Sequence, residues 1–284
     1  ERFIIKIDGY IKRGYSQLQN LLQDGQLKRD LQDFKMSKIN INTLVLHKIV
    51  KDEALNFEDI TVDVFEEILT CHKQNKMFST IENAFSGNIE NDCICLTFDD
   101  GFKSDIEIVL PRLKEKNAYA TFFIVKSYLN KNGYMNEKDV IELSNQGMQI
   151  GSHSMSHPNF LEIDNSKKIN ELESSRKYLE DLTSKKISTF SFPFGFTNKT
   201  LINLVFDAGY EYCCTSQHGV SKNYSRIIPR NSINGSHSIK KVFQIIDPNF
   251  MTKSAWFLED IIKSNLKSIS PKFYKKLRNI ISKQ

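Results

Sequence analysis

From residue 41 onward, short apolar segments typical of β-strands alternate with longer amphipathic segments that have helical spacing. The strand-like segments are residues 41–46, 93–98, 118–125, 148–151, 187–192 and 210–215. The helix-like segments are residues 62–74, 104–116, 136–146, 166–182 and 198–208. Such alternation predicts an α/β fold of βα units around a parallel sheet, and about seven strands in one run favour a closed or nearly closed barrel.

Both ends of the chain differ from this central part. Residues 1–40 are polar with leucines at roughly helical spacing, which predicts an N-terminal helical extension before a barrel at residues 41–252. Residues 253–284 predict basic amphipathic helices, interrupted at Pro271, with eight Lys or Arg against two Asp or Glu. The formal net charge is +5, yet residues 39–252 carry −4. This distribution argues against nucleic acid as a partner of the barrel.

The basic C-terminal helices have two interpretations. They pack on the barrel and leave a basic face in solvent, or they lie on an anionic membrane surface, where Lys and Arg interact with acidic lipids. The second interpretation would suit an enzyme that acts on lipid-linked or nascent surface glycans.

The cysteines indicate a reducing compartment. Their number is odd and two are adjacent, which does not make a disulfide framework, and no pair of CxxC knuckles indicates a zinc ribbon. The five are Cys71, Cys93, Cys95, Cys213 and Cys214. Buried structural thiols are predicted. The first residues also lack a signal-peptide core, so we expect a cytoplasmic location, with association at the inner face of a membrane as the alternative.

Three polar clusters each follow a predicted strand directly. They are Asp99-Asp100-Gly101, the segment from His153 to His157, and Pro193-Phe194-Gly195. Because the active site of a βα barrel is built at the carboxyl ends of its strands, these clusters are expected to converge. Taken alone, each has a structural alternative as a turn, a loop or a solvated pair. Their joint occurrence at strand ends favours a catalytic site.

The residue types predict metal chemistry. Two imidazoles at i and i+4 can face one cation if the segment turns like a helix, and one carboxylate completes three ligands of a catalytic Zn²⁺ site. Co²⁺ or Ni²⁺ also fits such a set. One of the two adjacent carboxylates would bind the metal, and the other would take a proton from a water whose pKa the metal lowers to about 7. The backbone N–H of Phe194, fixed after Pro193, can serve as an oxyanion donor.

These motifs resemble those of the polysaccharide deacetylase family, the NodB-homology domains of carbohydrate esterase family 4. The resemblance is carried by Thr-Phe-Asp-Asp-Gly at 97–101, His-Ser-Met-Ser-His at 153–157 and Phe-Pro-Phe-Gly at 192–195. Weaker similarity at 43–47, 60–69 and 228–230 extends it over about residues 41–235. The resemblance implies a deformed (β/α) barrel of about seven strands, a divalent metal that is usually zinc, and hydrolytic removal of acetyl groups from N-acetylated sugars.

The family also implies roles for individual residues. Asp99 would be the general base, the metal ligands would be Asp100, His153 and His157, and the segment with Pro193 and Phe194 would hold the oxyanion.

Two departures from the family pattern leave further roles open. Ser191 stands where many members have an Arg that orients the base. Residues 190–195 instead match a branch of the family that reads Phe-Ala-Tyr-Pro-Tyr/Phe-Gly. Arg230 is the candidate to pair with Asp99, with a structural Arg as the alternative. The late Leu-x-His motif of the usual general acid is not evident. His47, at the end of the first strand, is the better substitute than His237, with a structural histidine as the alternative.

The predicted function is metal-dependent removal of an acetyl group from an N-acetylated sugar of a surface polysaccharide or its biosynthetic precursor. Two alternatives are a hydrolase of the same fold that acts on a non-sugar amide and a non-catalytic carbohydrate-binding relic. The complete set of one base and three ligands argues against the relic. The linkage of the sugar to polymer, lipid or nucleotide stays open, as does the oligomeric state.

Overall fold

The computed structural model describes residues 39–70, 77–87, 89–195 and 197–269, with only the backbone of residues 261–269. These residues belong to the unit Ile39–Gln284. Three predicted features lie outside the described residues: Cys71, residues 1–38 of the N-terminal extension, and the C-terminal segment that follows Pro271. The predicted domain boundaries at residues 41 and 253 stay predictions; within the described chain, the first strand begins at Asn40 and the last helix at Phe250.

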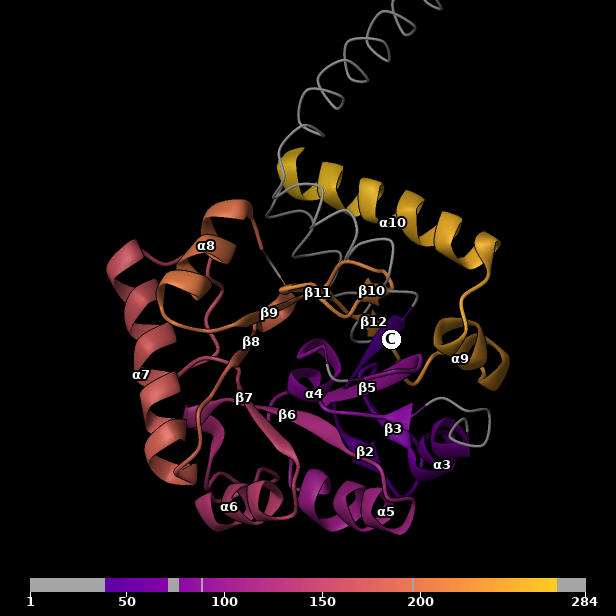
Figure 1. Ribbon diagram of the computed structural model, residues 1–284, viewed down its shortest axis with the longest axis horizontal. Helices are drawn as coiled ribbons and strands as arrows, with labels where there is room; N and C mark the ends of the chain where they lie inside the picture. Colours follow the sequence, from indigo (N-terminus) through magenta and orange to yellow (C-terminus); the bar gives the residue numbers. More distant parts are fainter. Residues whose placement is uncertain (1–38, 71–76, 88, 196, 270–284) are drawn as a thin grey trace, which may run out of the picture. The chain divides into compact units, whose positions relative to one another are not determined.

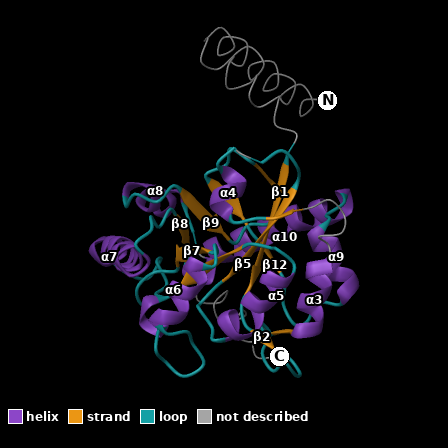
Figure 2. Cartoon of the chain, turned by 60° about the horizontal axis from the view of Figure 1, so that its bottom comes forward, coloured by secondary structure: helices purple, strands orange, loops and turns teal. Residues whose placement is uncertain are grey.

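The strands form a parallel, nearly closed barrel in which spatial order mostly follows chain order (Figures 1 and 2). The parallel strands, in spatial order, are β1 (Asn40–Leu46), β5 (Cys93–Phe98), β6 (Ala120–Ile124), β7 (Gln149–Ser152), β8 (Thr189–Ser191), β9 (Tyr212–Thr215) and β11 (Ile227–Pro229). The prediction of a βα barrel of about seven strands is therefore confirmed.

The barrel closes at a seam that apolar periodicity did not predict. β11 pairs with β9, and after one intervening residue, Arg230, β12 (Asn231–Ser232) pairs with β1 on the other side. The same short stretch of chain thus connects both edges of the sheet. The remaining short strands are β10 (Ser221–Lys222), antiparallel to β1, β4 (Met77–Phe78), parallel to β5, and the separate pair β2 (Ile49–Val50) and β3 (Ile60–Thr61).

Helices surround the strands, as Figure 2 shows. They are α3 (Val62–Thr70), α4 (Ile81–Phe85), α5 (Leu110–Glu115), α6 (Glu137–Asn145), α7 (Asn165–Thr183), α8 (Lys199–Asp207), α9 (Ile239–Ile246) and α10 (Phe250–Ile269). Local sequence starts several of them: Asn136 and Asp139 form a reciprocal capping box on α6, and Asp164 caps α7. A π-helical turn at Asp105–Val109 precedes α5, within a segment predicted as one helix.

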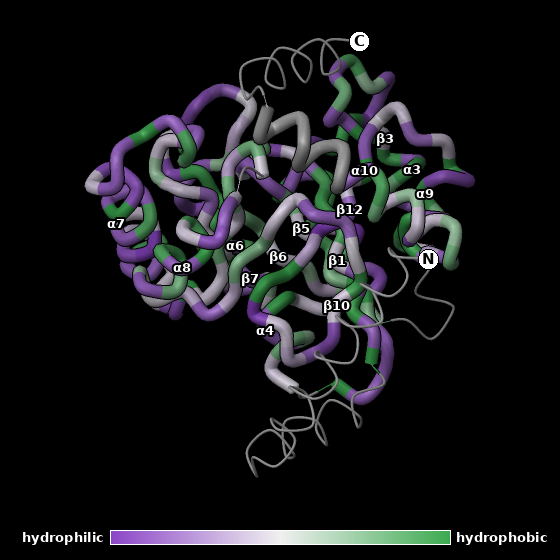
Figure 3. The backbone as a smooth tube through the Cα atoms, turned by 90° about the horizontal axis from the view of Figure 1, so that it is seen from above, coloured by the Kyte–Doolittle hydropathy of each residue, from purple (hydrophilic) through white to green (hydrophobic). Residues whose placement is uncertain are grey.

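Alternation along the strands divides the core into two clusters. On β5, Ile94 and Leu96 pack in the larger cluster with residues of the surrounding helices, whereas Cys93 and Cys95 lie in a smaller cluster with Phe123, Cys214 and residues of α4. Figure 3 shows that hydrophobic residues are frequent along the strands, whereas α7 is largely hydrophilic. The four described cysteines are buried and free, as predicted. Cys93, Cys95 and Cys214 supply small apolar volume in the smaller cluster, whereas Cys213 belongs to the larger one.

The C-terminal helix α10 packs on the barrel through one side. Trp256 is buried and stacks on His218, whose Nδ1 lies 2.9 Å from an Asp260 oxygen. The opposite side carries four exposed apolar residues, Phe250, Met251, Phe257 and Leu258, which are 60–81% exposed. Within the part of the chain that the structure describes, none of the helices has the length and apolar character needed to cross a membrane.

Candidate active site

The carboxyl ends of the strands bring the predicted site residues to one end of the barrel. His47 follows β1, Asp99 and Asp100 follow β5, His153 follows β7, and Pro193 and Phe194 come after β8. Arg230 sits at the seam between β11 and β12. Residues separated by up to 183 positions in the sequence therefore surround one site, as expected of a parallel βα barrel.

Asp100, His153 and His157 form a cluster that could hold a metal ion. Their ligand atoms lie within 4.8 Å of one another: Asp100 Oδ1 is 3.6 Å from His153 Nε2 and 3.4 Å from His157 Nε2. Asp100 Oδ1 is buried and has no hydrogen-bond partner. His153 Nδ1 lies 2.8 Å from the Ser191 carbonyl oxygen, which requires a proton on Nδ1 and leaves the Nε2 lone pair for a ligand. An orphaned carboxylate oxygen and an oriented imidazole fit a cation.

Left-handed backbone, rather than a helical turn, produces this convergence. Positive φ angles occur at Asp100 (77°), Ser154 (72°), His157 (60°) and Phe194 (59°), all within the three predicted motifs. The two imidazoles therefore face one site without the helical turn that was considered for residues 153–157. Non-glycine residues in this region are strained, and such strain concentrates at functional sites where the surrounding structure enforces it.

Asp99 lies in a different network, next to the cluster. Its two oxygens accept hydrogen bonds from Arg230 Nη1 (2.7 Å) and Nη2 (2.8 Å) in a bidentate pair. The same guanidinium donates to Thr97 Oγ1 (3.1 Å) and Ser191 Oγ (2.7 Å). Asp99 Oδ2 is also 3.7 Å from His153 Nε2, so this oxygen borders both the arginine and the histidine cluster.

The environments of the two aspartates shift their pKa values in opposite directions. Burial alone would raise the pKa of Asp99, but the charge of Arg230, then that of His153, and the hydrogen bonds from Arg230 hold it well below its usual range. Burial raises the pKa of Asp100, and His153 and His47 offset this only in part. A bound cation would favour the ionised Asp100.

His47 and Phe194 lie at the border of this site. His47 is half-buried and close enough to interact electrostatically with both aspartates. Phe194 is 43% exposed, and its ring centroid is 4.6 Å from that of His157, while Pro193 is buried. His237, the other histidine considered for the acid, instead approaches Asn234 through Nε2 at 3.4 Å.

An aromatic rim continues from His157 and was not predicted. Tyr128 lies 5.7 Å from the His157 ring and 4.8 Å from Tyr134, which stacks on Phe102 at 5.0 Å. Burial raises the pKa of both tyrosines, and Asp100 adds to the shift, which places them near the metal-ligand cluster. Tyrosines in polar segments after a strand give no sequence signal of this convergence. The roles of Thr97 and Ser191 were missed because their contacts with Arg230 are long-range.

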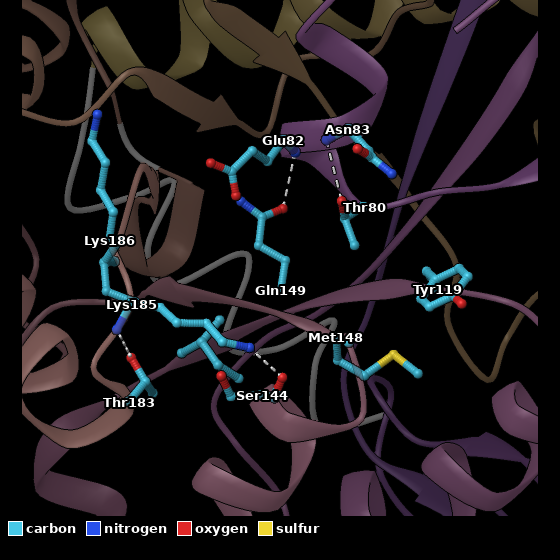
Figure 4. A pocket seen from close by; sticks show the side chains of 13 residues that line it. Thr80, Glu82, Asn83, Tyr119, Ser144, Met148, Gln149, Thr183, Lys185 and Lys186 are labelled. Atoms are coloured by element: carbon cyan, nitrogen blue, oxygen red, sulfur yellow. Dashed lines mark hydrogen bonds between the residues drawn. The ribbon is translucent and has the colours of Figure 1, made fainter. Parts of the chain in front are cut away.

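A pocket of about 420 Å³ lies at the other end of the strands. Its lining includes residues that precede or begin strands, such as Tyr119, Gln149 and Ile187. Figure 4 shows that its polar groups bond to one another: Gln149 Oε1 accepts from Glu82 N (3.0 Å) and Lys185 Nζ donates to Ser144 O (2.5 Å). None of the predicted catalytic residues lines this pocket, and the amino-terminal face of a βα barrel commonly serves stability.

Comparison with known proteins finds similarity to one family. The family model described as polysaccharide deacetylase matches residues 86–213. The chain is 32% identical over 124 residues to a peptidoglycan-N-acetylglucosamine deacetylase of Bacillus cereus, covering 42% of this chain and 43% of that protein. It is 34% identical over 110 residues to PgdA, a peptidoglycan-N-acetylglucosamine deacetylase of Listeria monocytogenes, covering 38% and 23%. The chain thus spans less than half the length of these relatives.

Solved structures share the fold. The Streptococcus pyogenes deacetylase PplD in complex with acetate has a TM-score of 0.65 at 21% identity, with 74% of this chain and 99% of that one covered. IcaB from Ammonifex degensii has a TM-score of 0.63 at 17% identity, with 72% and 96% covered. The resemblance to the polysaccharide deacetylase family is confirmed.

Proposed function

We propose that this protein is a metal-dependent hydrolase that removes the acetyl group from an N-acetylated sugar. The observation that carries the proposal is that Asp99 lies beside a cluster of one carboxylate and two imidazoles at one end of the barrel. Asp99 sits 3.7 Å from His153, next to the cluster of Asp100, His153 and His157. The family and the names of the relatives support the same chemistry.

The metal is proposed to be Zn²⁺, with Co²⁺ and Ni²⁺ as alternatives, since two imidazoles and one carboxylate with an open position suit these ions. Asp100 Oδ1, His153 Nε2 and His157 Nε2 would hold it. When bound, the ion polarises the acetyl carbonyl and acidifies a water molecule.

Asp99 accepts a proton from the attacking water in this mechanism. Arg230 keeps the Asp99 carboxylate ionised at neutral pH and fixes both of its oxygens, so that Oδ2 faces the histidine cluster. The same pairing lowers the basicity of Asp99, so proton transfer to it would be favoured by a water that the bound ion acidifies.

Two further groups act on the leaving amine and the carbonyl oxygen. His47, which interacts electrostatically with both aspartates, would donate a proton to the departing nitrogen. The Phe194 backbone N–H, held in a left-handed conformation after the buried Pro193, donates to the oxyanion.

The substrate is proposed to be a sugar because aromatic rings border the ligand cluster. Tyr128, Tyr134 and the exposed Phe194 offer apolar faces on which a pyranose ring can stack, together with phenolic hydroxyls for its polar groups. The names of the peptidoglycan-N-acetylglucosamine deacetylases favour an N-acetylglucosamine residue, which we propose belongs to a surface polysaccharide or its precursor.

The proposal is tested by acetate release from N-acetyl sugars, nucleotide sugars and oligosaccharides, with added Zn²⁺ or with a chelator. We expect zinc-dependent release from at least one substrate. Release only from non-sugar amides would favour the alternative hydrolase. Sugar binding without release by the zinc-loaded protein would favour the non-catalytic relic.

A cytoplasmic protein in peripheral contact with the inner face of a membrane is also proposed. Buried free thiols suit the compartment, and the exposed apolar side of α10 together with the basic excess of residues 253–284 suits an anionic surface. Co-sedimentation with anionic liposomes tests the contact. The double variant Phe257→Ser and Leu258→Ser should bind less than wild type, whereas Leu55→Ser, an exposed residue outside α10, should not. Equal, negligible binding by all three would refute it.

A further inference from the structure

The segment between the two ligand histidines holds a conformation that its own residues disfavour. Ser154 and His157 both have positive φ, at 72° and 60°, and neither is glycine. Such a backbone persists only where surrounding contacts determine it. The position of His157 therefore depends on whatever fixes residues 154–157.

Contacts within the motif and from the preceding loop account for part of this support. The His157 N–H donates to Ser154 Oγ (3.0 Å), and the Ser154 N–H donates to Ser152 Oγ (3.3 Å). The Ser127 N–H donates to the Met155 carbonyl oxygen (2.8 Å). These bonds do not involve the N–H groups of Met155 and Ser156, the two residues directly before His157.

Glu171 of α7 accepts from both of these N–H groups. Its Oε2 accepts from Met155 N (2.8 Å) and Ser156 N (2.9 Å), and its Oε1 accepts from Ser156 Oγ (2.6 Å). Successive N–H groups after a left-handed residue form a concave anion-binding nest, here occupied by a carboxylate of the same chain. Charged acceptors make stronger hydrogen bonds than neutral ones.

The helix that carries Glu171 is itself fixed. α7 spans 19 residues, its first turn is capped by the Asp164 side chain, and it buries Leu172 and Leu179. One turn after Glu171, the Ser175 hydroxyl lies 2.8 Å from Ser152 Oγ, on the residue just before His153. Glu171 and Ser175 thus attach both ends of the histidine loop to one helix.

We propose that Glu171 is a positioning residue of the metal site. Its carboxylate holds the Met155 and Ser156 peptides, and through them it sets His157 Nε2 at 3.4 Å from Asp100 Oδ1 without touching metal or substrate. The inference rests on the proposed metal-binding function and adds a residue to it from outside the three motifs. Outer partners of ligands commonly account for 10- to 100-fold in metal affinity.

The test compares Glu171→Gln with Glu173→Gln in the full chain. Glu173 is exposed on the same helix and provides a matched loss of charge. Metal-free proteins are titrated with Zn²⁺ against a chromophoric chelator, and Co²⁺ absorption spectra report ligand geometry. We expect Glu171→Gln to weaken zinc binding about 10- to 100-fold and to alter the cobalt spectrum, while Glu173→Gln matches wild type. Saturating zinc should restore acetate release by Glu171→Gln.

Further measurements separate positioning from general damage to the fold. Glu171→Asp keeps the charge on a shorter side chain and should bind zinc with intermediate affinity. Metal-free Glu171→Gln should keep the wild-type circular dichroism spectrum. Wild-type zinc affinity in Glu171→Gln, or an equal loss in Glu173→Gln, would overturn the inference while leaving the proposed function intact. Failure of wild type to bind zinc would overturn both, and zinc binding without acetate release would count against the proposed function alone.

Discussion

Asp99 and Asp100 are adjacent in the chain but belong to two different regions of the site. Asp99 accepts two hydrogen bonds from Arg230, which lies at the barrel seam. Asp100 instead faces two histidines, and its Oδ1 lacks a hydrogen-bond partner. A left-handed residue at Asp100 makes this divergence possible. Both oxygens of Asp99 accept hydrogen bonds from the protein, whereas Asp100 Oδ1 accepts none.

The different environments of Asp99 and Asp100 support the separate roles proposed for them. Two carboxylates whose environments move their pKa values apart can serve separate functions in one reaction. In the proposed mechanism, Asp99 would stay ionised and accept a proton, while Asp100 would be available to a cation. The following predictions test this contrast, from the largest expected effect to the smallest.

Asp99→Asn should reduce turnover by about 10²- to 10⁴-fold, because the site loses its proton acceptor. Zinc content should stay at the wild-type level, since the metal-ligand cluster does not include Asp99. Steady-state acetate release and metal analysis of the same preparation check both statements. Wild-type activity in this variant would remove Asp99 from the mechanism.

Asp100→Asn should lower zinc affinity by more than the roughly 100-fold expected of outer partners, because it removes a charged ligand. Activity should fall with metal occupancy. Competition with a chelator provides the measurement. If Asp100→Asn bound zinc normally and were inactive, the roles proposed for Asp99 and Asp100 would have to be exchanged.

Arg230→Gln should lower the free energy of unfolding by about 3–5 kcal/mol, because it leaves the buried Asp99 charge without its partner. Chemical denaturation measures this loss. Arg226→Gln is the matched control, since Arg226 is exposed and lies over Phe206 rather than Asp99. Equal stabilities for the two variants would mean that the ion pair adds no net stability.

The pH dependence of stability should have opposite signs in wild type and Arg230→Gln. In wild type, the lowered pKa of Asp99 contributes stability above its ordinary value near 3.8, and this contribution is lost as pH falls through the lower folded value. Without Arg230, burial raises that pKa, so the variant should lose stability as pH rises above about 4. Parallel stability curves over pH 3–7 would show that Arg230 does not control Asp99.

Ser191→Ala should have the smallest effect, about 1 kcal/mol of stability, through loss of the hydroxyl that accepts from Arg230 Nη2. Zinc affinity should not change, because His153 bonds to the Ser191 carbonyl oxygen rather than to its hydroxyl. A large loss of zinc affinity would mean that the two regions are coupled through this residue.

Much of the barrel could be predicted because its strands are apolar runs between amphipathic helices. β1 and β5 through β9 lie within two residues of the predicted segments. The seam could not be predicted in this way, because β11 and β12 are only three and two residues long and are separated by Arg230. The pairing of β12 also depends on β1, which lies near the other end of the described chain.

The site was predictable where chemistry follows a strand directly, as with Asp99, Asp100 and His153. The geometry that joins these residues was not, because the residue types of Asp100, Ser154 and His157 do not signal positive φ angles. Glu171 shows the limit: on sequence alone it is an ordinary acidic residue of an amphipathic helix.

The seam has a consequence for how the protein becomes active during synthesis. A chain made from its N-terminus presents Asp99 long before Arg230, which follows 131 residues later. The stretch that delivers the arginine is also the one that joins β9 to β1. Closure of the barrel and pairing of Asp99 with Arg230 therefore depend on the same stretch of chain, and a nascent chain that stops before residue 227 lacks both.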